Sequence, residues 1–316
     1  MDWRIKGCIQ GLLARTPGGN AINDALQRLA GGRVDEGAHI DAKFCKDWLV
    51  LADLLRVLDF RLRDKDLVEI GTGWLPVLPL CFALAGARRI HSFDLNRHMR
   101  HAAVPAALSR LESHLGALAR ACGLEEAEVR ERHAWLHDAG DGRAILERAG
   151  VVYHAPADAA ATGLSGASVA LVFSNSVLEH VPADALGAMM RESTRILQPD
   201  GLALHSVNCG DHYAYFDRSI TPIHYLRYSA RQWKRWNNDL LYQNRLRPCD
   251  FVDVAESAGL AIVHRVQTVR KELLSRLDTL PVAPEFQHYP PEELCTTSVT
   301  FAARPAAREA RRVPRG

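Results

Sequence analysis

The sequence lacks any cysteine pair at metal-binding or disulfide spacing, and it lacks a long apolar run. Its seven cysteines are odd in number, dispersed along the chain and never arranged as C-x-x-C. This spacing argues against a zinc site or a disulfide framework and favours a reducing, cytoplasmic location. No apolar run approaches the roughly 20 residues of a membrane-spanning helix, and the N-terminal stretch lacks the apolar centre of a secretion signal. We therefore predict no membrane partner.

The sequence also has little net charge. Its 316 residues include 39 basic and 37 acidic side chains, which gives a net charge of +2. Such a balance argues against a protein dedicated to nucleic acid, so we do not expect a nucleic-acid partner. Hydrophobic residues make up 47% of the chain, which is enough for a sizeable core. The composition leaves open whether the protein is a monomer or a homodimer.

Short apolar runs alternate with helical stretches between residues 65 and 207. The runs span 67–70, 89–93, 151–154, 168–173 and 201–207, and the helical stretches span 77–84, 99–149 and 183–197. Strands that alternate with helices form a parallel sheet covered on both faces. Two more strand patterns, at 261–266 and 296–301, bring the total to seven. We predict an α/β, Rossmann-like fold with a mostly parallel seven-stranded sheet and helices on both faces.

Four segments flank this α/β core of residues 65–207. Residues 1–64 have helical periodicity and predict an N-terminal helical cap. Residues 208–258 are irregular and aromatic-rich, and predict a substrate-side insert that ends in a helix at 250–258, capped by Gly259. Residues 259–303 are expected to complete the sheet with the last strands. Residues 304–316 are rich in Arg, Ala and Pro and predict a disordered tail.

The loop after the first strand carries two glycines, in the sequence V-E-I-G-T-G-W-L-P at 68–76. A third glycine for a dinucleotide fingerprint is missing, and so is the lysine loop that cradles phosphates. The loop therefore predicts a ligand other than a pyrophosphate. Asp94 ends the second strand, where a carboxylate can accept both ribose hydroxyls of a nucleoside. Glu69 adds an acid beside the loop, which suits a ligand with a cationic centre.

Four motifs in order resemble the class I S-adenosylmethionine-dependent methyltransferases. They are V-E-I-G-T-G at 68–73 with Asp94, H-A-P-A-D-A with Asp158, A-L-V-F-S-N-S-V-L-E-H-V-P at 170–182, and I-L-Q-P-D-G at 196–201. The resemblance covers residues 67–207 and implies methyl transfer from S-adenosyl-L-methionine, with S-adenosyl-L-homocysteine as product. It places Asp158 against the adenine amino group. It implies cofactor binding by Glu69, Gly71, Thr72, Gly73, Trp74, Asp94, Leu95, Asp158, Ala159, Ser174 and Asn175.

By analogy with the family, the motif after the fourth strand indicates which class of acceptor the protein methylates. Family members that methylate exocyclic amines of bases usually carry an Asn/Asp-Pro-Pro-aromatic tetrapeptide there, and this chain has S-N-S-V at 174–177. The difference favours a small-molecule acceptor such as a metabolite, a sugar or a natural product. We expect O-methylation. Two alternatives remain: an RNA or protein methyltransferase that uses the Arg-rich insert, and a non-methylating protein that binds the same cofactor.

Titratable side chains gather where the fourth and fifth strands end, the edge at which open α/β sheets bind ligands. The catalytic candidates are His180, His205, Asp211 and His212, with one histidine as general base. His180 is equally consistent with a histidine that only contacts backbone at a helix start. His205, Asp211 and His212 match no metal-binding spacing, so no metal site is predicted.

The insert interleaves basic and aromatic residues. This pattern fits a lid over an anionic acceptor, a solvated basic helix face, or a nucleic-acid surface. We favour the lid, with the N-terminal helical region as its other wall. The predicted substrate-binding residues are Tyr213, Tyr215, His224, Arg245 and Arg247. For the two tyrosines the alternative is that they pack the insert onto the core.

Overall fold

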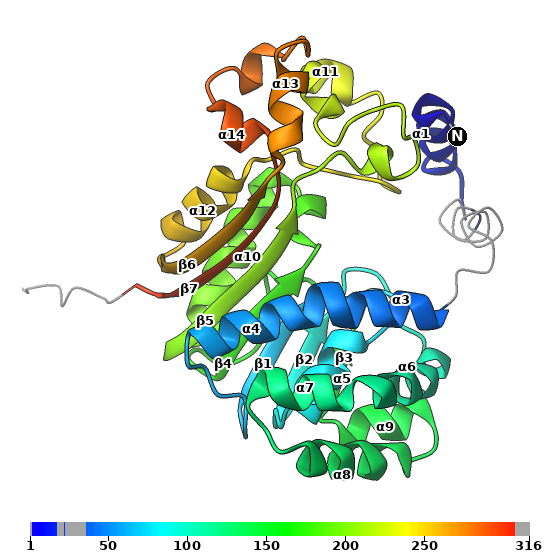
Figure 1. Cartoon of the computed structure of the whole chain (residues 1–316), viewed down its shortest axis with the longest axis vertical. Helices are drawn as coiled ribbons and strands as arrows, with labels where there is room; N and C mark the ends of the chain where they lie inside the picture. Colours follow the sequence, from blue (N-terminus) through cyan, green and yellow to red (C-terminus); the bar gives the residue numbers. More distant parts are fainter. Residues whose placement is uncertain (1, 18–21, 23–35, 307–316) are drawn as a thin grey trace, which may run out of the picture.

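A computed structural model describes residues 2–17, 22 and 36–306 (Figure 1). Its centre is one seven-stranded sheet in the order β3-β2-β1-β4-β5-β7-β6. The strands are β1 Asp66–Ile70, β2 Arg89–Phe93, β3 Val151–His154, β4 Val169–Asn175, β5 Leu197–Asn208, β6 Leu260–Val269 and β7 Thr296–Pro305. Only β7 runs antiparallel to its neighbours β5 and β6, while β1 to β5 pair in parallel. The predicted Rossmann-like, mostly parallel sheet is confirmed.

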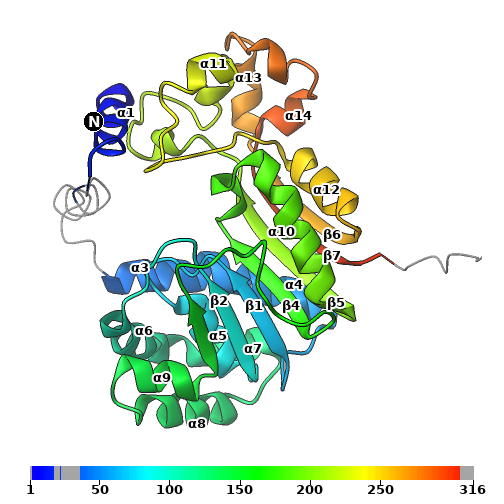
Figure 2. The ribbon, with the colours of Figure 1, turned by 180° about the vertical axis from the view of Figure 1, so that it is seen from behind.

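Helices cover both faces of the sheet because its central strands are apolar on both sides. Residues 169–174 of β4 are buried without a break, as expected for a parallel strand between two helical layers. One layer contains α3 Glu36–Ala42, the π-helix η1 Lys43–Trp48, α4 Leu49–Val57, α5 Val77–Leu84, α6 Val104–Leu111, α7 Leu115–Cys122, α8 Glu126–His137 and α9 Gly142–Arg148. The other layer contains α10 Ala183–Ile196 and α12 Pro248–Ser257, seen from behind in Figure 2.

The N-terminal helical region divides into two parts with different neighbours. The segment α3–η1–α4 lies along the sheet layer that holds α5 and α7 (Figure 1). Helix α1, Trp3–Leu13, packs instead against the insert, where Trp3 is buried among aromatic rings. The described part of the predicted cap is therefore two structural units, of which α1 packs against the insert.

The insert folds with the segment between β6 and β7 into a third hydrophobic cluster. From the insert come η5 His212–Tyr215, η6 His224–Arg227 and α11 Ala230–Trp233; from the later segment come η7 Lys271–Leu273, α13 Leu274–Leu277, η8 Pro284–Phe286 and α14 Pro291–Leu294. Their buried side chains meet those of α1. We call this group the upper cluster. It stands beyond the edge of the sheet at the top of Figure 1.

Two details of the C-terminal part bear on the sequence-based expectations. Gly259 has a φ of +88°, so it ends α12 in the left-handed conformation that was predicted. The predicted start of the tail at residue 304 is wrong, because Arg304 and Pro305 pair with β6 as the end of β7. The rest of the tail, 307–316, lies outside the described residues. Within the described part of the chain, no helix is long and apolar enough to cross a bilayer.

Candidate active site

The two glycines of the loop after β1 are required for different reasons. Gly71 and Gly73 both have positive φ, +81° and +70°, which side chains other than glycine rarely adopt. A Cβ on Gly71 would lie 2.4 Å from a methyl carbon of Val177, so the loop after β4 packs directly onto the loop after β1. A Cβ on Gly73 would meet nothing within 4 Å. The backbone at Gly73 is thus the open part of the loop.

Asp94 is tied to this loop from the end of β2. Its carboxylate accepts a hydrogen bond from the Gly73 amide at 3.2 Å and another from the Tyr153 hydroxyl at 2.7 Å. Burial raises the pKa of Asp94, and the bonds from Tyr153 and Gly73 partly oppose that shift. The carboxylate therefore sits beside the open backbone, where the sequence predicted a partner for ribose hydroxyls.

Glu69 supports the loop from inside. Its carboxylate accepts hydrogen bonds from the Thr72 hydroxyl at 2.7 Å and from the Ser92 hydroxyl. Burial, the largest cause, raises the pKa of Glu69 to about 7, against the effect of these two bonds. A carboxylate held in this way fixes the shape of the loop. The geometry gives Glu69 and Thr72 a positioning role, where the sequence had suggested that they contact the ligand.

Exposed apolar side chains flank the open backbone. Leu95, directly after Asp94, is 71% exposed, and Trp74, directly after Gly73, is 46% exposed. Apolar side chains make up most of the lining of small-molecule sites, and these two lie next to the open backbone. After β3, Ala159 is buried, whereas Asp158 is exposed and accepts a hydrogen bond from the Ala160 amide at 2.8 Å.

Ser174 and His205 face each other across β4 and β5. The Ser174 hydroxyl and the His205 Nδ1 lie 2.8 Å apart, and both side chains are completely buried. Burial lowers the pKa of His205 to about 4. An enclosed imidazole of this kind cannot reach an acceptor, so the structure does not support His205 as a base or Ser174 as a ligand contact. Asn175, one residue further along β4, is half-buried.

The π-helix η1 brings charged residues to the loop that were not predicted from the sequence. Asp47 is half-buried, and its pKa is raised by burial, while Lys43 and a hydrogen bond from Asn175 act in the opposite direction. The charge of Lys43 also lowers the pKa of Glu69, against the larger effect of burial. The available signal was the spacing of His39, Lys43 and Asp47, four residues apart, on a helix whose other flank is apolar. Short π-helical turns are frequent at functional sites.

A second group of side chains gathers just beyond Val177. Glu179 and His180 lie on η4, Leu178–His180, directly after β4, and His212 begins η5 after β5. One potential ligand atom from each of these three side chains lies within 4.8 Å of the others. Ser176, which leads into η4, has a φ of +54°, a strained value for a residue with a side chain. We call Glu179, His180 and His212 the acceptor-side cluster. Glu179 was not among the residues predicted from the sequence.

The three members of the acceptor-side cluster differ in burial. Glu179 is 1% exposed, and burial raises its pKa to about 8. His212 is 7% exposed, and burial lowers its pKa to about 3, with a further contribution from the charge of His180. His180 is exposed, and its Nδ1 lies 2.7 Å from the Tyr242 carbonyl oxygen. A carbonyl can only accept, so Nδ1 carries the proton and Nε2 is the free nitrogen.

Asp211 and Tyr215 frame His212 at the two ends of η5. The Asp211 carboxylate accepts a hydrogen bond from the Tyr213 amide at 2.9 Å and lies 3.5 Å from Nδ1 of His224. It caps the turn and does not reach the cluster. Tyr215 is exposed, its ring lies 5.6 Å from that of His212, and its hydroxyl accepts a hydrogen bond from Asn208. Tyr215 thus remains a candidate for acceptor contact.

Tyr213 and His224 belong to the interior of the upper cluster. The Tyr213 hydroxyl donates to the Trp236 carbonyl oxygen at 2.8 Å, and the side chain is buried. The His224 ring meets the Trp3 ring edge-on at 5.2 Å. Both were predicted as substrate contacts, and the structure instead places them in the packing of the insert, the alternative considered for Tyr213.

The predicted lid arginines are also internal. Arg247 is completely buried and donates hydrogen bonds to the carbonyl oxygens of Cys209 at 3.0 Å and Glu293 at 2.8 Å, and to that of Thr296. Arg245 is buried between the rings of Trp233 and Phe286, 5.3 and 5.0 Å away, with Glu285 at 3.6 Å. The prediction that these two side chains meet an anionic acceptor is wrong. They hold the insert to the segment between β6 and β7.

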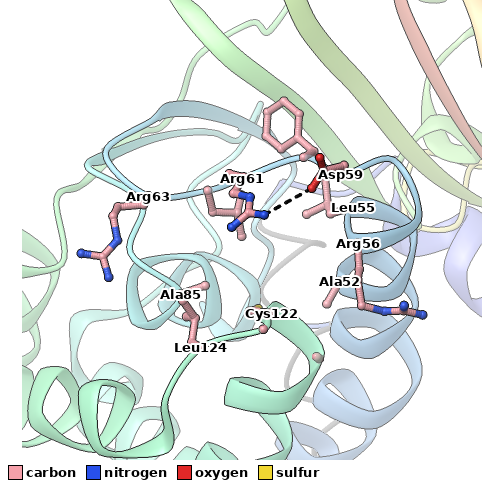
Figure 3. Close-up of a pocket in the computed structure, with 13 residues that line it drawn as sticks. Ala52, Leu55, Arg56, Asp59, Arg61, Arg63, Ala85, Cys122 and Leu124 are labelled. Atoms are coloured by element: carbon pink, nitrogen blue, oxygen red, sulfur yellow. Dashed lines mark ion pairs between the residues drawn. The ribbon is translucent and has the colours of Figure 1, made fainter.

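A further cavity lies away from this region. It has a volume of about 330 Å³ and lies between α4, the end of α7 and the chain that leads into β1 (Figure 3). It is therefore at the amino end of the strands, opposite the edge where open α/β sheets bind ligands. Its arginines are engaged by neighbouring acids, as Arg61 is by Asp59 at 3.6 Å and Arg56 by Asp53 at 2.6 Å.

Comparison with known proteins finds one family match. A family model described as a methyltransferase domain matches residues 39–265. No curated protein matches the chain in sequence. Among solved structures, a geranyl diphosphate C-methyltransferase from Streptomyces coelicolor A3(2), in complex with Mg²⁺, geranyl diphosphate and S-adenosyl-L-homocysteine, is 12% identical, with a TM-score of 0.45 over 87% of this chain and 86% of that chain.

Two further solved structures show a similar degree of likeness. An S-adenosylmethionine-dependent methyltransferase from Mesorhizobium loti is 16% identical, with a TM-score of 0.39 over 79% of this chain and 95% of that chain. The [4+2]-cyclase SpnF is 12% identical, with a TM-score of 0.43 over 82% and 81%. At this level of identity the likenesses say nothing about which acceptor this chain uses.

Proposed function

Because the chain belongs to the methyltransferase domain family and has the class I fold, we propose that it transfers the methyl group of S-adenosyl-L-methionine to a small molecule held at the acceptor-side cluster. S-adenosyl-L-methionine is the cofactor, and S-adenosyl-L-homocysteine is the product that leaves. One observation carries the proposal. Val177 packs onto Gly71 and lies two residues before Glu179, so the cofactor loop and the acceptor-side cluster adjoin.

Side chains around the loop after β1 match the ribose, the adenine and the amino-acid end of the cofactor. Asp94 receives the ribose hydroxyls, because its carboxylate already lies beside the open backbone of Gly73. Leu95 supplies an exposed apolar side chain for the adenine, and Asp158 an acid for the adenine amino group. Asn175 and Asp47 lie where β4 ends, on the side toward η1, and suit the amino-acid end of the cofactor.

Methyl transfer from a sulfonium needs alignment more than acid–base power. Holding donor and acceptor in line can supply roughly 7–11 kcal/mol of the barrier. We propose O-methylation, in which the hydroxyl proton passes to an imidazole nitrogen as the methyl group moves from sulfur to oxygen. His180 and His212 are the candidates for this base, since His205 is enclosed. Asp211 acts as a positioning residue that caps the turn on which His212 stands.

A small acceptor fits the insert better than RNA or a protein does. The Arg-rich stretch was the reason to consider a macromolecule, and two of its arginines, Arg245 and Arg247, are buried and engaged internally. Binding to RNA that weakens steeply with added salt would favour the macromolecular alternative. The cytoplasmic location and the monomeric or homodimeric state remain predictions from composition.

The proposal is tested by titrating the protein with S-adenosyl-L-methionine in a calorimeter and screening metabolite pools for transfer of a labelled methyl group. Gly73→Ala places a methyl group on the open backbone, whereas Gly123→Ala changes a glycine of the same conformation, φ +64°, at the end of α7. Both variants should lose about 1–2 kcal/mol of stability through backbone strain. Only Gly73→Ala should weaken cofactor binding, by at least about tenfold.

The outcomes separate the competing ideas. Absence of cofactor binding by the wild-type protein would overturn the proposal. If Gly73→Ala and Gly123→Ala lose the same affinity for the cofactor, the loop that contains Gly73 is not part of the cofactor site. Binding without transfer to any acceptor would favour the non-methylating alternative.

A further inference from the structure

We propose that Glu179, His180 and His212 form a binding site for a divalent transition-metal cation, with Zn²⁺ as the best-matched ion. The inference rests on the proposed function in one respect, since it assigns the cation to the place where the acceptor oxygen would lie. From the sequence we expected no metal, and weighed only His205, Asp211 and His212. The structure buries His205 and Asp211 elsewhere and joins His212 to two residues of η4.

The donor set is that of a three-ligand metal site, and the three side chains lie close enough together to converge on one ion. Two imidazoles and one carboxylate occur in catalytic zinc sites and leave at least one coordination position open. In a tetrahedral site, bonds of about 2.0–2.2 Å place ligand atoms roughly 3.3–3.6 Å apart. The three candidate atoms lie within 4.8 Å of one another, so side-chain rotations that bring them roughly 1 Å closer would complete the site. Two nitrogen donors favour zinc or a related ion over magnesium or calcium.

The burial of Glu179 also supports a bound cation, independently of the distances between the three side chains. The side chain is 1% exposed, and neither carboxylate oxygen accepts a well-formed hydrogen bond within the described part of the chain, although the Glu179 and Asn208 amides lie near. A buried carboxylate without a partner is costly, and a bound cation removes that cost. His212, 7% exposed, likewise has no hydrogen-bond partner at Nε2 in that part of the chain.

Neighbouring groups already orient the ligands, as the outer shell of a metal site does. The Nδ1 hydrogen of His180 bonds to the Tyr242 carbonyl oxygen, which leaves Nε2 as the donor. The His212 amide donates to the Gln243 side chain at 3.3 Å. The Asn244 amide donates to the Glu179 carbonyl oxygen at 2.9 Å. Three consecutive residues, 242–244, thus hold both short helices that carry the ligands.

A cation at this place changes how the acceptor would be activated. An imidazole nitrogen bound to metal cannot accept a proton, so the histidines would serve as ligands. The acceptor hydroxyl would bind the open position, where the cation lowers its pKa, and release its proton to water. The oxygen would then take the methyl group from sulfur, leaving S-adenosyl-L-homocysteine, the methyl ether and an unchanged cation.

The test measures zinc bound to chelator-stripped, full-length protein by equilibrium dialysis with elemental analysis. We expect the wild type to bind one equivalent of zinc per chain. Glu179→Gln and His212→Gln should each bind zinc at least about 100-fold more weakly. This loss is larger than the 10–100-fold that is typical when a residue that only orients a metal ligand is changed. His91→Gln is the matched control, because His91 and His154 form a close histidine pair, 3.1 Å apart, on β2 and β3. It should keep full stoichiometry.

A thermal melt provides a second readout that does not depend on activity. Glu179→Gln replaces a buried carboxyl group by an uncharged amide of the same shape, so without zinc it should melt no lower than the wild type, and it should lose the zinc-induced rise in Tm. No zinc binding by the wild type, or binding unchanged in Glu179→Gln, would overturn the site. Titration of the same sample with S-adenosyl-L-methionine distinguishes the two proposals. If the protein binds the cofactor but not zinc, only the metal site is overturned. If it binds zinc but not the cofactor, only the proposed function is overturned.

Discussion

Arg247 is surrounded by hydrogen-bond acceptors from four parts of the chain. Its guanidinium contacts the carbonyl oxygen of Cys209 directly after β5, the Tyr225 hydroxyl, the carbonyl oxygen of Glu293 in α14, and that of Thr296 at the start of β7. A planar group with five donors is well suited to such a junction. The same residue type in an exposed lid would have bound an acceptor, and composition alone does not distinguish the two.

Arg247→Met should therefore act on stability. Removal of the guanidinium leaves several buried carbonyl oxygens unpaired, and we expect the free energy of unfolding to fall by about 2–4 kcal/mol. Arg231→Met, on the exposed side of α11, should stay within about 0.5 kcal/mol of the wild type. Chemical denaturation of both variants measures the difference. A rise in KM for Arg247→Met at unchanged stability would restore the lid interpretation.

Glu69 predicts a pH dependence of stability that can be assigned to one side chain. Burial raises its pKa from 4.5 to about 7 in the folded protein, with the Asp94 charge adding to the shift and Ser92, Thr72 and Lys43 opposing it. The folded state then holds a proton that the unfolded state has lost. Stability should fall as pH rises from about 4.5 to about 7, by up to roughly 3 kcal/mol.

Glu69→Gln should remove the Glu69 share of this slope, because the amide keeps the shape of the carboxylate and does not titrate. Glu179, whose pKa burial raises to about 8, contributes a share of its own in both proteins. Its free energy of unfolding, measured by denaturation at several pH values, should be flatter than that of the wild type between pH 4.5 and 7. An identical slope in the two proteins would assign the pH dependence to other buried acids, such as Asp94.

At the scale of helices and strands, the sequence predicts those elements whose residues form a local hydrophobic pattern. Helix α5 was predicted over its full extent because residues 77–84 are entirely apolar and buried. The bounds of β2 and β3 were also predicted correctly. Strands β4 to β7 are longer than predicted, since their ends gain hydrogen bonds from neighbouring strands that an isolated apolar run does not reveal.

The acceptor-side cluster could be predicted only in part, because it depends on two separate turns. Glu179 and His212 come from η4 and η5, and no local periodicity signals that these turns meet. The π-helix η1 likewise packs against a distant element, with the Trp48 ring 4.8 Å from the Phe82 ring of α5. Sequence motifs identified the cofactor loop, where Gly71, Gly73 and Asp94 are neighbours within one βαβ unit. They did not identify which histidine would be enclosed, which depends on the pairing of β4 with β5.

At the scale of the whole molecule, apolar side chains form the two sheet layers and the upper cluster. Trp3 connects α1 to the upper cluster. It is 2% exposed, its ring lies 4.8 Å from that of Trp236 and 5.4 Å from that of Tyr213, and its amide donates to Asp217 at 3.0 Å. The cofactor loop, by contrast, belongs to the sheet. The two regions therefore predict separable responses to mutation and to ligand.

Trp3→Ala should loosen the upper cluster without altering the cofactor loop. Loss of a fully buried indole costs about 3–5 kcal/mol, and we expect calorimetry to show an early transition for the upper cluster ahead of a main transition near that of the wild type. S-adenosyl-L-methionine should raise only the main transition. Trp135→Ala, which truncates a 54% exposed indole on α8, is the matched control and should leave the melting profile nearly unchanged. A single transition lowered as a whole would show that the upper cluster and the sheet unfold together, and that α1 stabilises the cofactor site as well.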